Sequence, residues 1–241
     1  GACIEAGQKG WLGLLPITLF GCGIVFGALF LMAERRQTHP MLPTGLFGTR
    51  TFTVAVGVGF GFNLSLYGSL LCLSIYLQQV RHQSALATGL LLLPMAALVA
   101  LGSIVSGRLT SRVGQRLPMI IGFVIAGAGA CILLAVKAHT SMLLVVIGTL
   151  ALALCSIAMP AMSSLAVNSA PSKRAGVASG VFNTARQAGG ALGVAILGSL
   201  FAARGSLLHP MTVAAAVLLL SAVVSFFGAR APETSPAGRK R

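Results

Sequence analysis

Hydrophobic and polar residues along this chain form seven long apolar runs separated by short polar segments. The runs cover residues 11–32, 52–78, 84–106, 117–136, 141–168, 175–203 and 211–228. A helix needs about 20 apolar residues to cross the hydrocarbon core of a bilayer. Outer-membrane strands are shorter and alternate in polarity, which these runs do not do. The pattern predicts an all-α membrane protein with seven transmembrane helices.

Composition agrees with a membrane environment. Hydrophobic residues make up 56% of the chain and charged residues only 8%, whereas soluble domains are about a quarter charged. The net charge of +14 raises nucleic acid as a partner. However, the basic residues lie in short loops between apolar runs, so we interpret them as determinants of membrane topology and expect no nucleic-acid partner.

The loop charges predict the orientation of the chain, because positively charged loops stay in the cytoplasm. The loops after the first, third, fifth and seventh runs hold most of them: Arg35, Arg36, Arg50, Arg108, Arg112, Arg116, Lys173, Arg174, Arg230, Arg239, Lys240 and Arg241. The opposite loops and the N-terminus hold only Lys9, Arg81, Lys137 and Arg204. We therefore expect a cytoplasmic C-terminus and, with an odd number of helices, an external N-terminus.

The chain divides into a linker helix and a larger domain. It begins GACIEAGQKGW, without Met or a basic signal region, so we expect it to be the back part of a longer protein. Prolines and glycine break any helix between the first two runs. We expect an external segment with a linker transmembrane helix at 1–33, a cytoplasmic linker at 34–51, a six-helix domain at 52–229 and a basic tail at 230–241. Six-helix transporter domains are often two inverted three-helix repeats.

Polar residues inside the second run mark a candidate cavity. On a helical wheel, one face carries Asn63, Tyr67, Ser74 and Gln78. Polar groups cost free energy in lipid, so this face is expected to line a cavity or to hydrogen-bond to another helix. In the fifth run, Met159, Met162 and Ser163 surround Pro160 and suggest a kinked, adaptable wall, with plain core packing as the alternative.

The sixth run contains the only charge within the apolar runs, Arg186. One face of this run is formed by Gly176, Gly180, Asn183, Gln187 and Gly190. Arg186 projects about 60° from the centre of that face, so it is expected to point into protein, between the inner interface and mid-membrane. No carboxylate is close in sequence. A structural clamp and a role in transport both remain open.

Glycines at four-residue spacing predict close helix contacts, as at Gly57 and Gly61, Gly176 and Gly180, and Gly189 and Gly193.

Enzyme and metalloprotein chemistry find no support in these residues. The four histidines fall in four different loops, the cysteines form no CxxC pair, and the chain has no aspartate and no HExxH motif. We therefore expect neither an enzyme nor a metal or cofactor site. A self-contained seven-helix receptor or scaffold is the alternative, although a retinal protein would need a lysine in the run 211–228, which has none.

Several stretches, in order and spacing, resemble the fourteen-helix drug:proton antiporters of the major facilitator superfamily, the EmrB/QacA type. They are IEAGQKGW, YLQQVRHQSALATGLLLLP, GRLTSRVGQR and RAGVASGVFNTARQAGGALGVAILGS. The resemblance implies the second half of a multidrug efflux transporter in the bacterial inner membrane. It would export lipophilic or cationic small molecules by alternating access with an N-terminal half, using the proton gradient and no bound cofactor.

The same resemblance suggests gate residues. Gly107, Arg112, Gly114 and Arg116 match a cytoplasmic loop pattern of the superfamily, with Ser111 at the position of its acid. We expect Arg186 to act as a further gate residue near the cytoplasmic end of the cavity. Proton coupling needs a titratable group in the membrane, and the seven runs hold no Asp, Glu, Lys or His. The coupling carboxylates are therefore expected in the N-terminal half.

Overall fold

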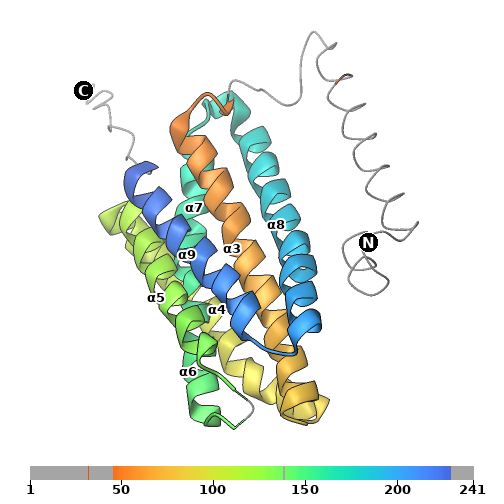
Figure 1. The fold of residues 1–241 in the computed structure, drawn as a ribbon. Helices are drawn as coiled ribbons and strands as arrows, with labels where there is room; N and C mark the ends of the chain where they lie inside the picture. The colour runs from red at the N-terminus through yellow and green to blue at the C-terminus, as the bar shows by residue number, and fades with distance from the viewer. Residues whose placement is uncertain (1–31, 33–45, 138, 229–241) are drawn as a thin grey trace, which may run out of the picture.

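The computed structural model describes Met32, residues 46–137 and residues 139–228. Within these residues the chain forms six antiparallel helical rods (Figure 1). The rods consist of α3 (Arg50–Ile75) continued by the π-helix η2 (Tyr76–Val80), α4 (Ala85–Val113), α5 (Arg116–Leu134), α6 (Met142–Ala153) joined through η3 (Leu154–Ile157) to α7 (Ala158–Asn168), α8 (Ala175–Arg204) and α9 (Leu208–Gly228). A short 3₁₀ turn, η4 (Ser172–Arg174), precedes α8.

The rods coincide with six of the seven predicted runs, which confirms the all-α membrane fold. Five of them are long and apolar enough to cross a membrane. The rod α8 is not among the five because Arg186 and the polar residues around it lower its hydropathy, although its 30 residues exceed the length required. The first predicted helix, most of the 34–51 linker and the basic tail lie outside the described residues.

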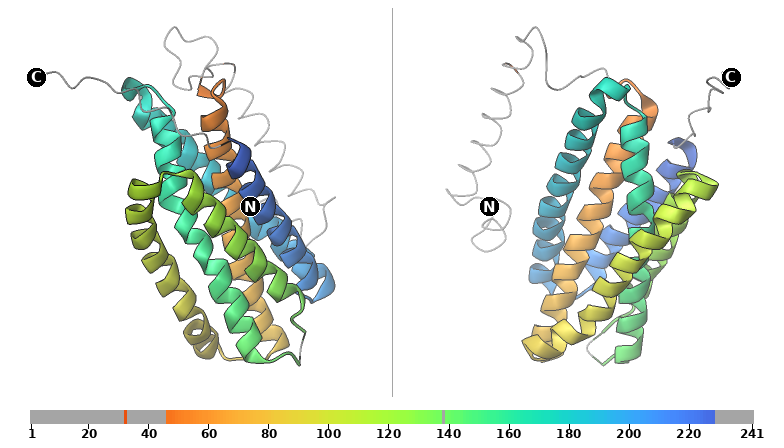
Figure 2. Two further views of the ribbon diagram at one scale, coloured as in Figure 1. Left: turned by 90° about the vertical axis from the view of Figure 1, so that its left-hand side faces the viewer. Right: turned by 180° about the vertical axis from the view of Figure 1, so that it is seen from behind.

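The six rods form two three-helix repeats that run in opposite directions. The rod α3–η2 starts at one end of the bundle and α6–η3–α7 starts at the other (Figure 1). Contacts between the repeats are exchanged in a matching way: α3 packs on α8, α4 packs on the α6–η3–α7 rod, and α5 packs on α9. Figure 2 shows α4 and α8 at opposite edges of the bundle. The expected inverted repeat is therefore present in this domain.

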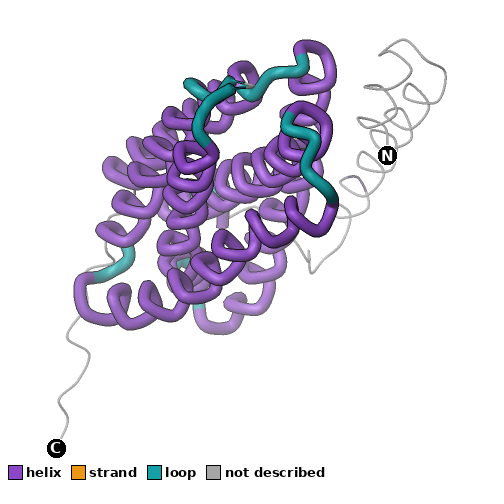
Figure 3. The backbone as a smooth tube through the Cα atoms, turned by 90° about the horizontal axis from the view of Figure 1, so that it is seen from below, coloured by secondary structure: helices purple, strands orange, loops and turns teal. Residues whose placement is uncertain are grey.

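Sequence-local signals explain where the rods begin and bend. The Ser84 hydroxyl accepts a hydrogen bond from the Ala87 amide at 3.2 Å and caps α4. Pro160 cannot donate a backbone hydrogen bond, and the preceding turn tightens into the 3₁₀ segment η3. This break separates α6 from α7 in the middle of the rod. Figure 3 shows the bundle from below, with the short loops that join the helices in teal.

One predicted boundary was wrong. We expected the third run to end at Ser106 and its arginines to lie in a loop, but α4 continues to Val113. A helix can extend into the interface because its own backbone hydrogen bonds do not depend on lipid. It ends at Gly114, whose φ of 80° suits a residue without a side chain, and α5 begins two residues later.

Candidate functional site

The site is organised around a close contact between α3 and α8. A Cβ atom on Gly193 would collide with the carbonyl oxygen of Leu64, and one on Gly189 would collide with the carbonyl of Phe60. Only glycine allows the two backbones to approach this closely. The packing predicted from the Gly189 and Gly193 pair is confirmed.

The other glycine pairs behave differently. A Cβ atom on Gly61 would lie 3.0 Å from side-chain atoms of α9, which is a close contact. A Cβ atom on Gly57, Gly176 or Gly180 would have no atom of another described helix within 4 Å. The predicted close contacts are therefore absent at Gly57, Gly176 and Gly180 among the described helices, because these glycines lie on faces of α3 and α8 that point away from them.

Near the contact between α3 and α8, the guanidinium of Arg186 lies close to two aromatic rings. Its Cζ is 5.7 Å from the ring centroids of both Phe62 and Phe182, a distance at which a cation is attracted to the ring face. Nη2 donates to Oδ1 of Asn63 at 3.5 Å and approaches Sδ of Met159 at 3.9 Å. Both polar contacts are long, so the charge is only weakly satisfied. The helices α3, α7 and α8 position it together.

Arg186 has further donors that the described residues do not use. Its Nε is buried and has no hydrogen-bond partner among them. Residues 46–137 and 139–228 contain no Asp or Glu, so this part of the chain offers no carboxylate. The side chain fits here because Gly59 leaves room: a Cβ atom there would lie 3.2 Å from Cγ of Arg186. The expectation that Arg186 points into protein agrees with its half-buried position.

The four predicted polar residues of α3 do not act as one surface. Asn63 is buried beside Arg186, whereas Tyr67 is 45% exposed. Nε2 of Gln78 donates to Oγ of Ser74 at 3.1 Å, so these two satisfy each other near the end of the rod. Gln78 lies in the π-helical turn η2, beyond the end of the regular helix α3.

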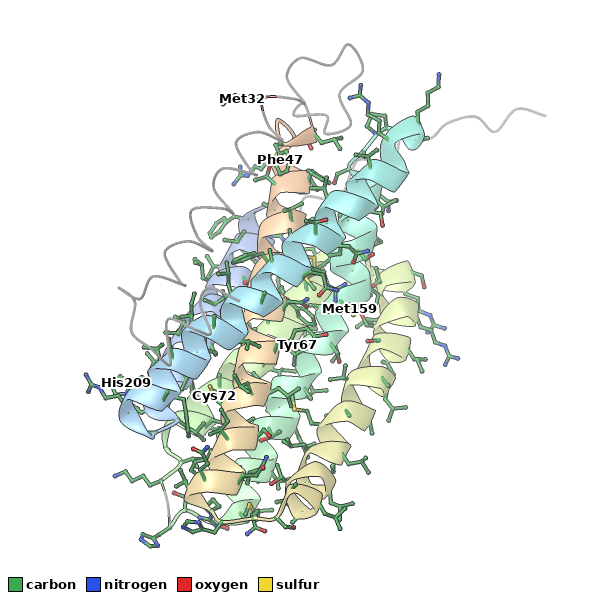
Figure 4. All side chains as sticks on the ribbon, turned by 90° about the vertical axis from the view of Figure 1, so that its right-hand side faces the viewer. Met32, Phe47, Tyr67, Cys72, Met159 and His209 are labelled. Atoms are coloured by element: carbon green, nitrogen blue, oxygen red, sulfur yellow. The ribbon has the colours of Figure 1, made fainter. Side chains whose placement is uncertain are left out.

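The predicted residues of α7 and α8 are also divided. Met159 contacts Arg186, Met162 is fully buried in the hydrophobic core, and Ser163 is half-buried. Asn183 and Gln187 are exposed rather than bonded to Arg186. Figure 4 shows Met159 and Tyr67 on one side of the bundle, near its middle.

An open pocket of about 410 Å³ lies between α3 and α4, beside Tyr67. Tyr67 belongs to its wall and also packs on α8, where a Cβ atom on Gly190 would lie 3.1 Å from its ring. The other lining residues are Leu66, Leu70, Gly89, Leu92, Leu93, Met95, Ala96 and Val99. Sequence reasoning missed this α4 wall, since apolar side chains that line a pocket and those that face lipid follow the same pattern.

The four gate residues predicted from the loop pattern lie at the end of the bundle where α4 meets α5, whereas Arg186 lies apart from them, beside Asn63 and Met159. Gly107 and Arg112 are exposed on α4, and Gly114 forms the turn. The Cζ of Arg116 lies 4.4 Å from the ring centroid of Phe226 on α9, so this charge is held within the domain. The described residues contain no group of three or more His, Cys, Asp or Glu side chains that could hold a metal ion.

The fold and the site together define a class. A six-helix membrane domain built from inverted repeats, with irregular helices and a partly satisfied charge at its centre, is typical of secondary transporters. The family description of the Major Facilitator Superfamily matches residues 6–194 and 58–241. The chain belongs to this superfamily of transporters, and it is a multi-pass membrane protein.

Curated relatives carry names connected with drug resistance. The chain is 34% identical over 206 residues to the multidrug resistance protein Stp of Mycobacterium tuberculosis, covering 84% of this chain and 38% of that protein. It is 31% identical to the tetracenomycin C resistance and export protein of Streptomyces glaucescens, over 83% of this chain and 38% of the relative. The quinolone resistance protein NorB of Staphylococcus aureus is 30% identical over 90% of this chain and 48% of its own length. The chain spans about two fifths of the first two relatives.

Proposed function

We propose that this chain forms the C-terminal half of a proton-coupled efflux transporter of the fourteen-helix drug:proton antiporter type. The observation that carries the proposal is the open middle of the domain. There α3, α4, α7 and α8 surround Arg186 and the apolar pocket, and α4 is little buried by its own domain. A second six-helix domain facing these helices would close a cavity between two halves, as alternating access requires.

The relatives named above support small-molecule efflux as the activity. An adaptable apolar pocket suits lipophilic compounds of different shapes. We place the transporter in the bacterial inner membrane. Arg108 and Arg112, which are exposed, would latch the two halves at the cytoplasmic end, and Arg186 would change partners between the inward-open and outward-open states.

Proton coupling is assigned to the N-terminal half. The described part of the chain has no Asp or Glu, and its histidines lie near the ends of the bundle. Proton-driven transport requires a group that binds and releases a proton within the membrane. The coupling carboxylates would therefore belong to the partner domain.

Vesicle transport of a fluorescent lipophilic dye tests this proposal. Everted vesicles containing both halves should export dye when a proton gradient is applied and should stop when it is collapsed. Vesicles containing this chain alone, at equal membrane abundance, should show no gradient-dependent export. Export by the chain alone would contradict both the half-transporter assignment and the location of the coupling groups.

The orientation has its own test. Single cysteines replace Ser111 near the α4–α5 turn and His139 in the α5–α6 loop, both exposed, in a protein without native cysteines. In intact cells, His139→Cys should react with a membrane-impermeant thiol reagent, and Ser111→Cys should react only after the membrane is opened. The reverse labelling would overturn the cytoplasmic placement of the basic end.

A further inference from the structure

We propose that Arg186 and the neighbouring pocket form a subsite for lipophilic organic anions. The acidic group of the ligand, such as a carboxylate, would bind Arg186, and its apolar body would occupy the space between α3 and α4. This inference rests on the proposed efflux function and names the class of substrate. The sequence predicted lipophilic or cationic substrates, whereas this subsite favours lipophilic anions.

The first argument is the missing counter-charge. A guanidinium has five N–H donors in a planar fork that matches a carboxylate. Among the described residues, the one oxygen acceptor that Arg186 reaches is the neutral amide of Asn63, at 3.5 Å from Nη2. Because no described residue is an acid, an incoming carboxylate would make the first strong charge-assisted hydrogen bonds to Arg186.

The second argument is the environment of the charge. Two phenylalanine rings flank Cζ of Arg186 at 5.7 Å, Asn63 is only 2% exposed and Arg186 is half-buried, so the contact is partly shielded from water. Electrostatic attraction is stronger in such a low-dielectric setting than at an exposed surface. A ligand cation entering the same space would instead meet an unneutralised positive charge.

The third argument is the spacing between the charge and the pocket. Tyr67, on the pocket wall, follows Asn63 by one helical turn on α3, and Gly190, which packs on Tyr67, follows Arg186 by one turn on α8. One turn corresponds to about 5–6 Å along each helix. The apolar wall therefore begins about one helical turn from the residues that hold the guanidinium, which suits a compact aromatic or aliphatic acid.

A matched pair of fluorescent ligands tests the subsite: pyrenebutanoic acid and its neutral primary amide. Equilibrium binding is measured with the whole transporter in lipid nanodiscs, and export is measured separately in vesicles. The wild-type protein should bind the acid at least fivefold more tightly than the amide. Arg186→Gln should weaken acid binding about tenfold and change amide binding less than twofold. Arg204→Gln, which removes an exposed charge from the same helix, is the matched control and should leave both affinities unchanged.

A second variant keeps Arg186 in place and neutralises it. Asn63→Asp puts a carboxylate of nearly the same shape next to Nη2, so it should abolish the preference for the acid while Arg186 remains. This variant decides the question if Arg186→Gln does not accumulate in the membrane. Retention of the fivefold preference in Asn63→Asp would overturn the proposal.

The two possible sources of a carboxylate are distinguished by the same measurements. If Arg186 pairs with an acid of the N-terminal half instead of a ligand, Arg186→Gln will weaken acid and amide equally, and the subsite is rejected. Equal wild-type affinities for acid and amide also reject it. Binding with the expected preference but without export in vesicles would overturn the proposed efflux function and leave the anion subsite standing.

Discussion

Two crossings between the repeats, α3 on α8 and α4 on the α6–η3–α7 rod, correspond in the fold but differ in the groups that make the contact. Where α3 crosses α8, backbone lies on backbone, and Gly193 leaves no space for a side chain. Where α4 crosses the α6–η3–α7 rod, hydroxyl groups make the contact. The hydroxyl of Ser156 occupies the space beside Gly102, and Ser106 donates to the carbonyl oxygen of Ile157.

The α3–α8 crossing is tightly packed, whereas α4 is packed more loosely against its own domain. In an apolar 18-residue stretch of each rod, 67% of the α3–η2 stretch is buried but only 17% of the α4 stretch. A charge in the membrane needs partners, and Arg186 lies beside the tight crossing, where it reaches Asn63. A pocket for varied ligands benefits from a wall with fewer internal contacts, which α4 provides. Two crossings with the same topology thus serve different purposes: one positions Arg186, and the other leaves α4 free to line the pocket.

The largest effect is expected at the tight crossing. In Gly193→Ala the new methyl group would meet the carbonyl oxygen of Leu64, and a backbone atom cannot move aside alone. Overpacking of this kind costs about 1–3 kcal/mol or more, so the melting temperature of the purified protein should fall by roughly 5–10 °C. Gly57→Ala, at a position with nothing within 4 Å, is the control and should melt like wild type. Equal melting of both variants would show that the crossing is not tight.

A smaller effect on stability is expected where the same crossing lies beside Arg186. In Gly59→Ala the methyl group would lie 2.6 Å from the ring of Phe182 and 3.2 Å from Cγ of Arg186. Both neighbours are side chains and can shift, so the cost should be about 1 kcal/mol and the melting temperature should fall by about 3 °C. Because Arg186 is displaced, affinity for the acidic ligand should fall about threefold, equivalent to under 1 kcal/mol. An unchanged affinity would mean that the position of Arg186 does not matter for binding.

The smallest effect is expected at the α4 crossing. Ser106→Ala removes the hydroxyl that donates to the Ile157 carbonyl, and such a bond contributes about 0.5–1.5 kcal/mol. The melting temperature should fall by roughly 2 °C. Ser103→Ala, whose hydroxyl bonds only within α4 to the Val99 carbonyl, serves as the control. A decrease as large as that of Gly193→Ala would remove the distinction between the two crossings.

Local patterns in the sequence predicted the helices well and their faces less well. The glycines at 189 and 193 correctly indicated backbone contact, yet Gly176 and Gly180 have the same spacing and contact no described helix. Spacing shows that a helix can pack closely, but a second helix must be present at that face. The wheel assigned Gln78 to the same face as Asn63, but Asn63 is buried beside Arg186, whereas Gln78 is exposed and bonds to Ser74.

The sequence by itself determined that this chain crosses a membrane, where six of its helices lie, and that Arg186 avoids lipid. These properties follow from the cost of exposing charge and unpaired backbone groups to hydrocarbon, which each segment meets alone. Only the tertiary structure decided that Asn63, Met159 and two phenylalanine rings surround Arg186, and that α4 forms the second wall of the pocket. These groups come from separate helices, and their meeting depends on how the two repeats cross, which no single segment encodes.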